Sequence, residues 1–232
     1  MIHRYLVPAA LAAAACGGDR NPPAAAAPAP AAATPAPAAP LPLPDALLRG
    51  TAHLEPNLTF RSCESRTIVT AFDSTGGRLV STYRLMQAST DPGMYLLARG
   101  TTAGNGAVIL REVEYASLPS ATEGCDQPPP SGEIAARGAN PDWRLAISGS
   151  GIEFTRTTDP SSIVFPAATP TGSGASIRYQ VSGGSGGSHT LQLDLSKAAC
   201  NVGTKFTYAS MQASLVIDGT RLRGCAWRTR LP

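Results

Sequence analysis

One segment of the sequence matches the pattern of a catalytic serine. Residues 183–187 read GGSGG, which satisfies G-x-S-x-G with Ser185 at the centre. A serine nucleophile of this kind lies between a strand and a helix, and its Asp and His partners follow farther along the chain. Here both flanking segments alternate like strands, and His189 follows after only four residues. We therefore interpret residues 182–188 as a mobile hairpin loop and predict no catalytic residue.

Two pairs of titratable residues have the spacing of a strand face. Glu112 and Glu114 lie two residues apart in a predicted strand and so face the same side of it, and His53 and Glu55 have the same spacing. Such pairs can exchange protons with a substrate. Two polar residues on one strand face are more commonly the side that faces water. We interpret both pairs as solvated.

Arginines gather near the C-terminus, at Arg221, Arg223, Arg228 and Arg230. A guanidinium group binds phosphate well, so this cluster could contact lipid head groups or lipopolysaccharide. The alternative is that Arg is simply the default cation, because the chain has 17 Arg and 2 Lys. The sequence leaves both interpretations open.

Two tryptophans, Trp143 and Trp227, each lie at the edge of a predicted strand. A Trp at the mouth of a barrel can line a ligand pocket, although core packing is its commoner role. On the ligand interpretation, Trp143, Arg221, Arg223 and Trp227 form the candidate surface for a ligand or partner.

The cysteines predict a disulfide framework. If Cys16 is set aside for the N-terminal signal, then Cys63, Cys125, Cys200 and Cys225 remain. An even number in an exported chain suggests two disulfides, for which three pairings exist. A stretch without Cys separates the first two from the last two, which favours Cys63–Cys125 and Cys200–Cys225.

The N-terminus predicts export and lipid attachment. Arg4 supplies a positive charge, and residues 5–15 form an apolar run that is too short to span a bilayer. Small residues then lead to Cys16, which resembles a bacterial lipobox, although Ala13 stands where Leu is usual. We predict a signal peptide at 1–15 and a lipid on Cys16, with a plain secretory signal as the alternative. By resemblance to enterobacterial lipoproteins, Gly17 favours the outer membrane, facing the periplasm.

Residues 16–44 predict a disordered tether. Between Pro22 and Pro44 there are 9 Pro and 11 Ala, a composition that buries nothing and forms no stable helix. Such a segment extends by about 3.1 Å per residue where it is polyproline-like. It would hold a folded head away from the membrane or act as a simple spacer.

The overall composition excludes several classes of protein. The net charge of +3 and the lack of aromatic residues within a basic groove argue against a nucleic-acid partner. No stretch of eighteen apolar residues predicts a membrane-spanning helix. Without a C-x-x-C spacing, and with only His53 and His189 left after processing, we predict no metal site and no cofactor.

Period-two alternation recurs from residue 50 to the end and predicts an all-β fold. The first half gives strands at 58–61, 67–72, 79–86, 94–100 and 107–115, with turns at 73–77 and 101–106. The second half gives strands at 133–136, 143–148, 151–157, 161–165, 175–181, 190–195, 214–217 and 221–227. Asp218-Gly219 is the strongest hairpin signal, and Ser148–Gly151 is a second tight turn. Residues 196–211 predict a short helix or a long loop.

The Pro- and Gly-rich stretch 119–132 divides the alternating segments. We therefore predict a first β domain at 45–127 and a second at 128–232. Each would be a small antiparallel barrel or sandwich, and closure is favoured because it removes exposed sheet edges.

Two motifs resemble known bacterial envelope families. GANPDW at 138–143 resembles the G-N-E-P-F-W signature of an uncharacterised envelope lipoprotein family, in which a later Cys accompanies a G-C-A segment, here Cys200 and 224–226. The segment FRSC at 60–63 resembles the F-R-P-C segment of NlpE-like lipoprotein domains, which often accompany META/HslJ-like modules. These resemblances imply a β architecture and an envelope location, but no enzymatic activity.

The sequence therefore leaves three functional hypotheses. The first is a non-enzymatic envelope lipoprotein that contacts envelope proteins or a small ligand. The second is a carrier that binds a hydrophobic or anionic molecule in a barrel cavity. The third is a hydrolase of envelope polymers, for which the sequence offers no convincing nucleophile and base.

Overall fold

The computed structural model confirms the all-β class, with one short helix in the part of the chain that it describes. It describes residues 44–86, 93–120, 122–128, 131–202 and 207–231, without the side chains of 159 and 160. The predicted signal peptide, Cys16 and the tether up to residue 43 lie outside these residues. The helix that is described does not meet the length and hydropathy needed to cross a bilayer.

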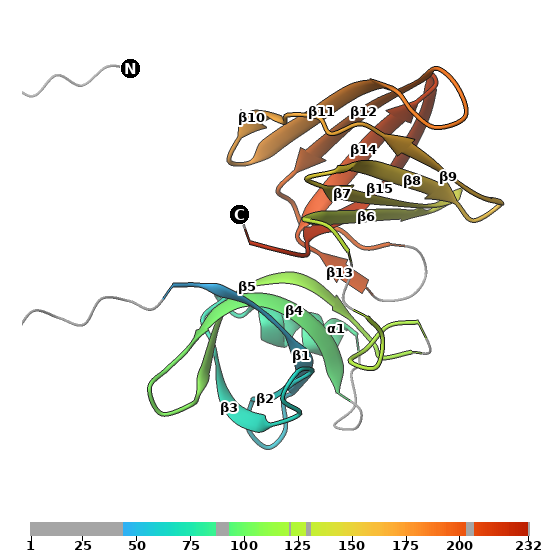
Figure 1. Cartoon of the computed structure of the whole chain (residues 1–232). Helices are drawn as coiled ribbons and strands as arrows, with labels where there is room; N and C mark the ends of the chain where they lie inside the picture. The colour runs from blue at the N-terminus through green and yellow to red at the C-terminus, as the bar shows by residue number, and fades with distance from the viewer. Residues whose placement is uncertain (1–43, 87–92, 121, 129–130, 203–206, 232) are drawn as a thin grey trace, which may run out of the picture. The chain divides into compact units, whose positions relative to one another are not determined.

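The first sheet closes into a five-stranded barrel (Figure 1). The ring runs β5-β3-β2-β1-β4 and returns to β5, because β4 also pairs with β5. All its pairings are antiparallel except β3–β5, which is parallel. The strands are β1 (Ala46–His53), β2 (Thr59–Ser62), β3 (Ile68–Asp73), β4 (Met94–Thr102) and β5 (Val108–Ser117).

The helix α1 (Arg78–Leu85) corrects the strand predicted at 79–86. Its inward side chains Leu79, Thr82, Tyr83 and Met86 are buried at spacings of three and four, which is the period of a helix. The turn before it fixes the start, since the Thr75 hydroxyl accepts the Leu79 N–H at 2.9 Å. The strand prediction was wrong because the buried positions follow the helical period.

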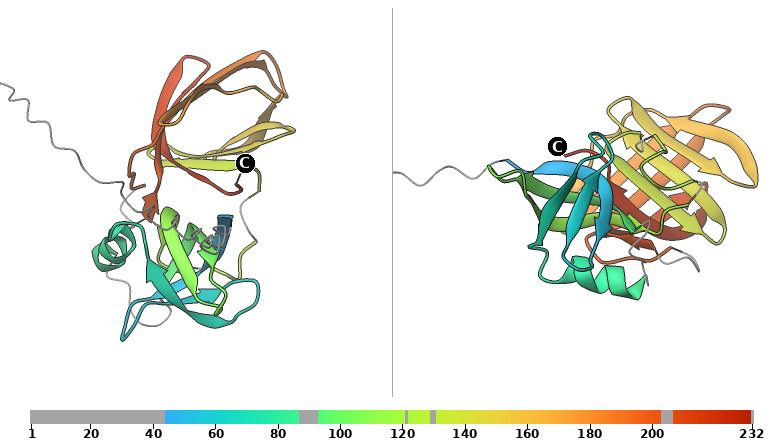
Figure 2. Two further views of the ribbon diagram at one scale, coloured as in Figure 1. Left: turned by 90° about the vertical axis from the view of Figure 1, so that its left-hand side faces the viewer. Right: turned by 90° about the horizontal axis from the view of Figure 1, so that it is seen from below.

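The second sheet has nine antiparallel strands in the order β10-β11-β12-β14-β15-β6-β7-β8-β9. It curls into a half-barrel whose end strands do not pair (Figure 2). Its strands are β6 (Ile134–Ala139), β7 (Asp142–Ser148), β8 (Gly151–Arg156), β9 (Asp159–Phe165), β10 (Thr171–Ser173), β11 (Ser176–Gly183), β12 (His189–Ser196), β14 (Met211–Ile217) and β15 (Thr220–Arg228).

Both predicted tight turns are confirmed. Ile217 pairs with Thr220 across Asp218-Gly219, and both turn residues have positive φ, 48° and 77°. That conformation is the one a two-residue hairpin requires, and it favours an Asp-Gly pair. Ser148 likewise pairs with Gly151.

The loop that contains Ser185 closes the open side of the second sheet. It joins β11 to β12, as predicted, and Gly183 pairs with His189. The Ser185 N–H donates to the Val164 carbonyl at 3.0 Å, and the Val164 N–H donates to Ser185 Oγ at 3.0 Å. Ser185 thus satisfies backbone groups at the free edge of β9, and its hydroxyl is used structurally.

Residues 42–232 form one unit by their contacts. The predicted boundary near 128–130 falls between β5 and β6, yet a short strand from beyond it, β13 (Thr207–Ala209), pairs with β5. It lies in the segment for which the sequence predicted a helix or a loop. Each sheet encloses its own apolar cluster, and a third cluster, which includes Tyr115 and Trp227, draws residues from both sheets.

Candidate ligand-binding cleft

The described residues form a cleft of about 420 Å³ where the two sheets meet, here called the junction cleft. Outward side chains of β6, β7 and β8 form one wall, and the loop between β5 and β6 forms another. The exposed wall carries opposite charges, Arg144 on β7 and Glu153 on β8, beside Thr155. These groups make the cleft polar at its open side.

Aromatic rings form the floor of the junction cleft. The Trp227 ring packs on Tyr115 with centroids 4.4 Å apart, and Tyr95 meets Tyr115 edge-on at 6.4 Å. The Arg137 guanidinium lies over the Tyr115 and Trp227 rings, at 5.4 and 5.8 Å from their centroids. Cation–π contacts of this kind hold Arg137 in place from one side.

A hydrogen-bonded triad joins the floor to the loop. Tyr115 Oη donates to Glu123 Oε2 at 2.6 Å, Arg137 donates to Tyr115 Oη at 2.7 Å, and Arg137 also pairs with Glu123 Oε1. Burial raises the pKa of Tyr115, and the negative charge of Glu123 raises it further. Burial alone would raise the pKa of Glu123, but several side-chain hydrogen bonds, that of Tyr115 among them, and the charge of Arg137 outweigh it and lower the pKa. The triad is therefore a neutral phenol between two fixed opposite charges.

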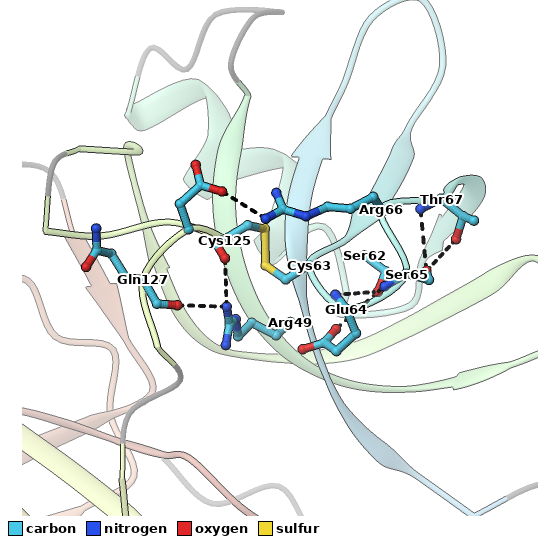
Figure 3. Close-up of a disulfide and its surroundings, with 10 residues drawn as sticks. Arg49, Ser62, Cys63, Glu64, Ser65, Arg66, Thr67, Cys125 and Gln127 are labelled. Carbon is cyan, nitrogen blue, oxygen red and sulfur yellow. Dashed lines mark hydrogen bonds and ion pairs between the residues drawn. A yellow bond between two sulfur atoms is a disulfide. The ribbon is translucent and has the colours of Figure 1, made fainter.

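The disulfide Cys63–Cys125 attaches this loop to the first barrel (Figure 3). Arg49 on β1 donates to the carbonyl oxygens of Cys125 and Gln127, at 3.0 and 2.9 Å. Arg66 pairs with Asp126 at 2.8 Å. Because these contacts bracket the segment that follows Glu123, they set the position of the cleft wall.

The second predicted disulfide is also present. Cys200 bonds to Cys225, which lies on β15, and the backbone of Cys200 pairs with that of Ala209 on β13. Both favoured pairings are therefore confirmed by the structure. Cys200–Cys225 attaches β15 of the second sheet to the segment that reaches the first sheet.

A β-bulge in β5 turns Glu114 into the junction between the sheets. Leu97 pairs with Tyr115, but the next residue, Ala98, pairs with Val113, so that Glu114 has no opposite partner on β4. A bulge of this kind re-aims a side chain. Glu114 is fully buried.

The interpretation of Glu112 and Glu114 as a solvated pair is therefore wrong. Glu114 accepts a hydrogen bond from Ser210 Oγ at 2.6 Å and lies 3.8 Å from the Arg228 guanidinium. Glu112 pairs with Lys197 at 2.7 Å. The prediction assumed a strand without a bulge. A local sequence pattern also cannot reveal Ser210, a partner that lies 96 residues farther along the chain. Glu55, of the other pair, is exposed as expected.

Trp143 corrects the candidate surface, because its side chain is fully buried in the second sheet. A Cβ on Gly138 would lie 2.2 Å from the indole Nε1, and one on Gly224 would lie 2.7 Å from Cζ2. The two glycines therefore leave the space that the ring fills. The fold thus brings together the 138–143 and 224–226 motifs around a packing contact.

The other candidate residues lie in two places. Trp227 lines the junction cleft but is only 7% exposed. Arg221 and Arg223 are exposed on the outer face of β15, away from the residues that line that cleft. Arg223 faces Ser214, which in turn faces Asp194, the ion-pair partner of Arg178. The four predicted residues therefore do not form one surface: Trp143 lies in the core, Trp227 lies in the junction cleft, and the two arginines lie on the outer face.

Comparisons with protein-family models, with curated proteins and with solved structures find no match to this chain. The geometry alone therefore defines the site. Sequence reasoning did not single out Tyr115, Glu123 or Arg137. Their spacing of 8 and 14 residues matches no motif, and only the folded chain brings them together.

Proposed function

We propose that this chain is a lipid-anchored lipoprotein of the bacterial cell envelope whose folded head is a non-enzymatic binding module. The observation that carries the binding role is the junction cleft, with an aromatic floor and opposite charges on its exposed wall. A concave site with a few convergent polar groups is the usual form of a ligand site. The occupant would be a polar segment of an envelope protein or a small ligand that presents both charges.

The anchor rests on the sequence. The apolar run at 5–15 and the small residues before Cys16 support export and lipid attachment. The Ala- and Pro-rich segment that follows supports a tether between the lipid and the head. The membrane, which Gly17 suggests is the outer membrane, is then the first partner of the protein.

A binding role without catalysis fits the chemistry of the described groups. The Ser185 hydroxyl is engaged with the backbone of β9, and the carboxylate of Glu123 is held by Tyr115 and Arg137. A general base or nucleophile would need to reach a substrate from such positions. The alternative is a carrier with a ligand inside a barrel. It has less support, because buried apolar side chains such as Leu110 and Leu193 fill both interiors.

Photo-cross-linking in living cells tests the proposal. A photoreactive residue replaces Thr155 in the cleft or, as the control, Gln180 on the exposed face of β11, each with Cys16 intact or changed to Ser. We expect a discrete adduct from position 155 alone and membrane retention that Cys16→Ser abolishes. Equal adducts from both positions would contradict a binding cleft, and membrane retention of the Cys16→Ser protein would contradict the anchor.

A further inference from the structure

A second pocket opens at one end of the curled sheet, among the β8–β9, β11–β12 and β14–β15 turns. It has a volume of about 530 Å³. Arg156, at the end of β8, lines it together with His189 and Asp218. None of these three residues lines the junction cleft.

The pocket has an apolar floor. Phe154 and Ile217 are 2% and 1% exposed, and Ile163 packs against the same apolar cluster from β9. The Arg156 guanidinium lies over the Phe154 ring, 5.8 Å from its centroid. A charged group therefore stands directly above apolar surface.

Arg156 differs from the other arginines that carry a buried Nε. Arg49, Arg99 and Arg137 also have an Nε without an acceptor, but each donates to an oxygen through its terminal nitrogens. For Arg156, no hydrogen-bond acceptor and no ion-pair carboxylate is found among the side chains that the structure describes. A buried donor left in this way destabilises the fold unless an acceptor reaches it.

Asp218 is already occupied by other donors. Its two carboxylate oxygens accept the Thr190 N–H and the His189 ring nitrogen, each at 2.8 Å. These contacts hold the imidazole at the pocket and lower the pKa of Asp218, and the charge of Arg156 lowers it further although the two residues form no ion pair. Among the described side chains that line the pocket, none places a carboxylate within ion-pair distance of Arg156.

We infer that this pocket binds a small carboxylate with an aliphatic body. The carboxylate accepts hydrogen bonds from the terminal nitrogens of the Arg156 guanidinium, since guanidinium and carboxylate favour a paired geometry. The aliphatic body lies on Phe154, Ile163 and Ile217. This site is separate from the junction cleft and does not depend on the proposed function.

Calorimetric titration with octanoate tests the site. The full chain carrying Cys16→Ser is titrated with octanoate and with octanol, its uncharged counterpart. We expect octanoate to bind at least ten times more tightly than octanol. Arg156→Met keeps the aliphatic stem but removes the donors, and we expect it to weaken octanoate binding at least tenfold.

Arg84→Met, on the exposed face of α1, removes one positive charge elsewhere and should leave the affinity unchanged. Circular dichroism confirms that each variant is folded, and Arg156→Lys, which keeps the charge, should retain part of the affinity. Equal binding of octanoate and octanol, equal loss in Arg84→Met, or no binding of octanoate to the folded protein would each overturn the inference.

Discussion

Gly138 and Gly224 are the residues on which the packing of Trp143 depends. Neither has the positive φ that would require glycine, so the constraint on them is space. A Cβ on Gly138 would also lie 2.5 Å from the Arg223 carbonyl oxygen, and one on Gly224 would lie 2.1 Å from that of Arg137. Backbone groups cannot move aside as a flexible side chain can, so even one added methyl group strains the sheet.

Gly138→Ala should therefore lower the free energy of unfolding by about 2 kcal/mol, as overpacked cores do. Urea denaturation of the full chain carrying Cys16→Ser measures the change. Gly104→Ala is the matched control, because no atom lies within 4 Å of the added Cβ there. Trp143→Phe should recover part of the loss in the double variant. A Gly138→Ala protein as stable as the Gly104→Ala control would contradict this account of the motif.

The strands were predictable wherever one face of a regular ladder is buried. The segment 190–195 alternates Thr, Leu, Gln, Leu, Asp and Leu, and its leucines are buried on β12. Residues 79–86 were predicted as a strand but form a helix, because a short amphipathic segment can fit the period of a strand as well as that of a helix. β13 is only three residues long, and its partner β5 lies ninety residues earlier, so no local signal marks it.

The candidate site was less predictable than the fold. Glu114 becomes buried through a bulge, and Tyr115, Glu123 and Arg137 meet through tertiary contacts. Cysteine spacing was informative, because four cysteines allow only three pairings and the long stretch between Cys125 and Cys200 favours one of them. The pairing of Cys63 with Cys125 then defines which element forms the cleft wall.

At the scale of elements, the loop between β5 and β6 depends on that disulfide. The bond closes a separation of 62 residues, for which the chain-entropy model gives about 4 kcal/mol as an upper guide. Joint replacement of Cys63 and Cys125 by Ser should lower stability by up to this amount. It should also speed hydrogen exchange in residues 122–127, because the loop would lose its covalent attachment and keep only non-covalent contacts such as those of Arg49, Arg66 and Arg137.

Joint replacement of Cys200 and Cys225 by Ser is the control. It removes a disulfide with a separation of 25 residues, worth up to about 3.5 kcal/mol in the same model. Hydrogen exchange at residues 122–127 should not change in that variant, because the loop keeps the disulfide Cys63–Cys125. Mass spectrometry of peptic fragments measures both. Similar acceleration in the two variants would mean that the loop responds to global stability and that Cys63–Cys125 does not position it.

Across the whole folded unit, the described ion pairs that join residues 45–127 to residues 128–232 all have the same polarity. The first half supplies the carboxylates Glu112, Glu114 and Glu123, and the second half supplies the cations Lys197, Arg228 and Arg137. The composition follows the same division. Residues 45–127 carry nine acidic and seven basic residues, and residues 128–232 carry six acidic and ten basic ones. The junction is therefore an electrostatic contact as well as an apolar one.

Acid should weaken this junction. Burial alone would raise the pKa of Glu112, but its hydrogen bonds with Lys197 and Arg99 and their charges outweigh it, so the pKa of Glu112 is lowered, as is that of Glu123. A carboxyl with a folded pKa below its unfolded value of 4.5 stabilises the fold above that pH. The contribution is lost as the pH falls through the folded pKa. Urea denaturation between pH 7 and pH 3 should therefore show stability falling below about pH 4.5.

Glu112→Gln and Glu123→Gln should each be less stable than the unaltered chain at pH 7 and should flatten the decline toward low pH. The reason is that each variant removes one group whose protonation differs between the folded and unfolded states. Glu55→Gln, at an exposed carboxylate of the first barrel, should leave the profile unchanged. If all three variants lost stability in parallel with the unaltered chain, acid would be acting through other carboxylates. The ion pairs across the junction would then not be what links its stability to pH.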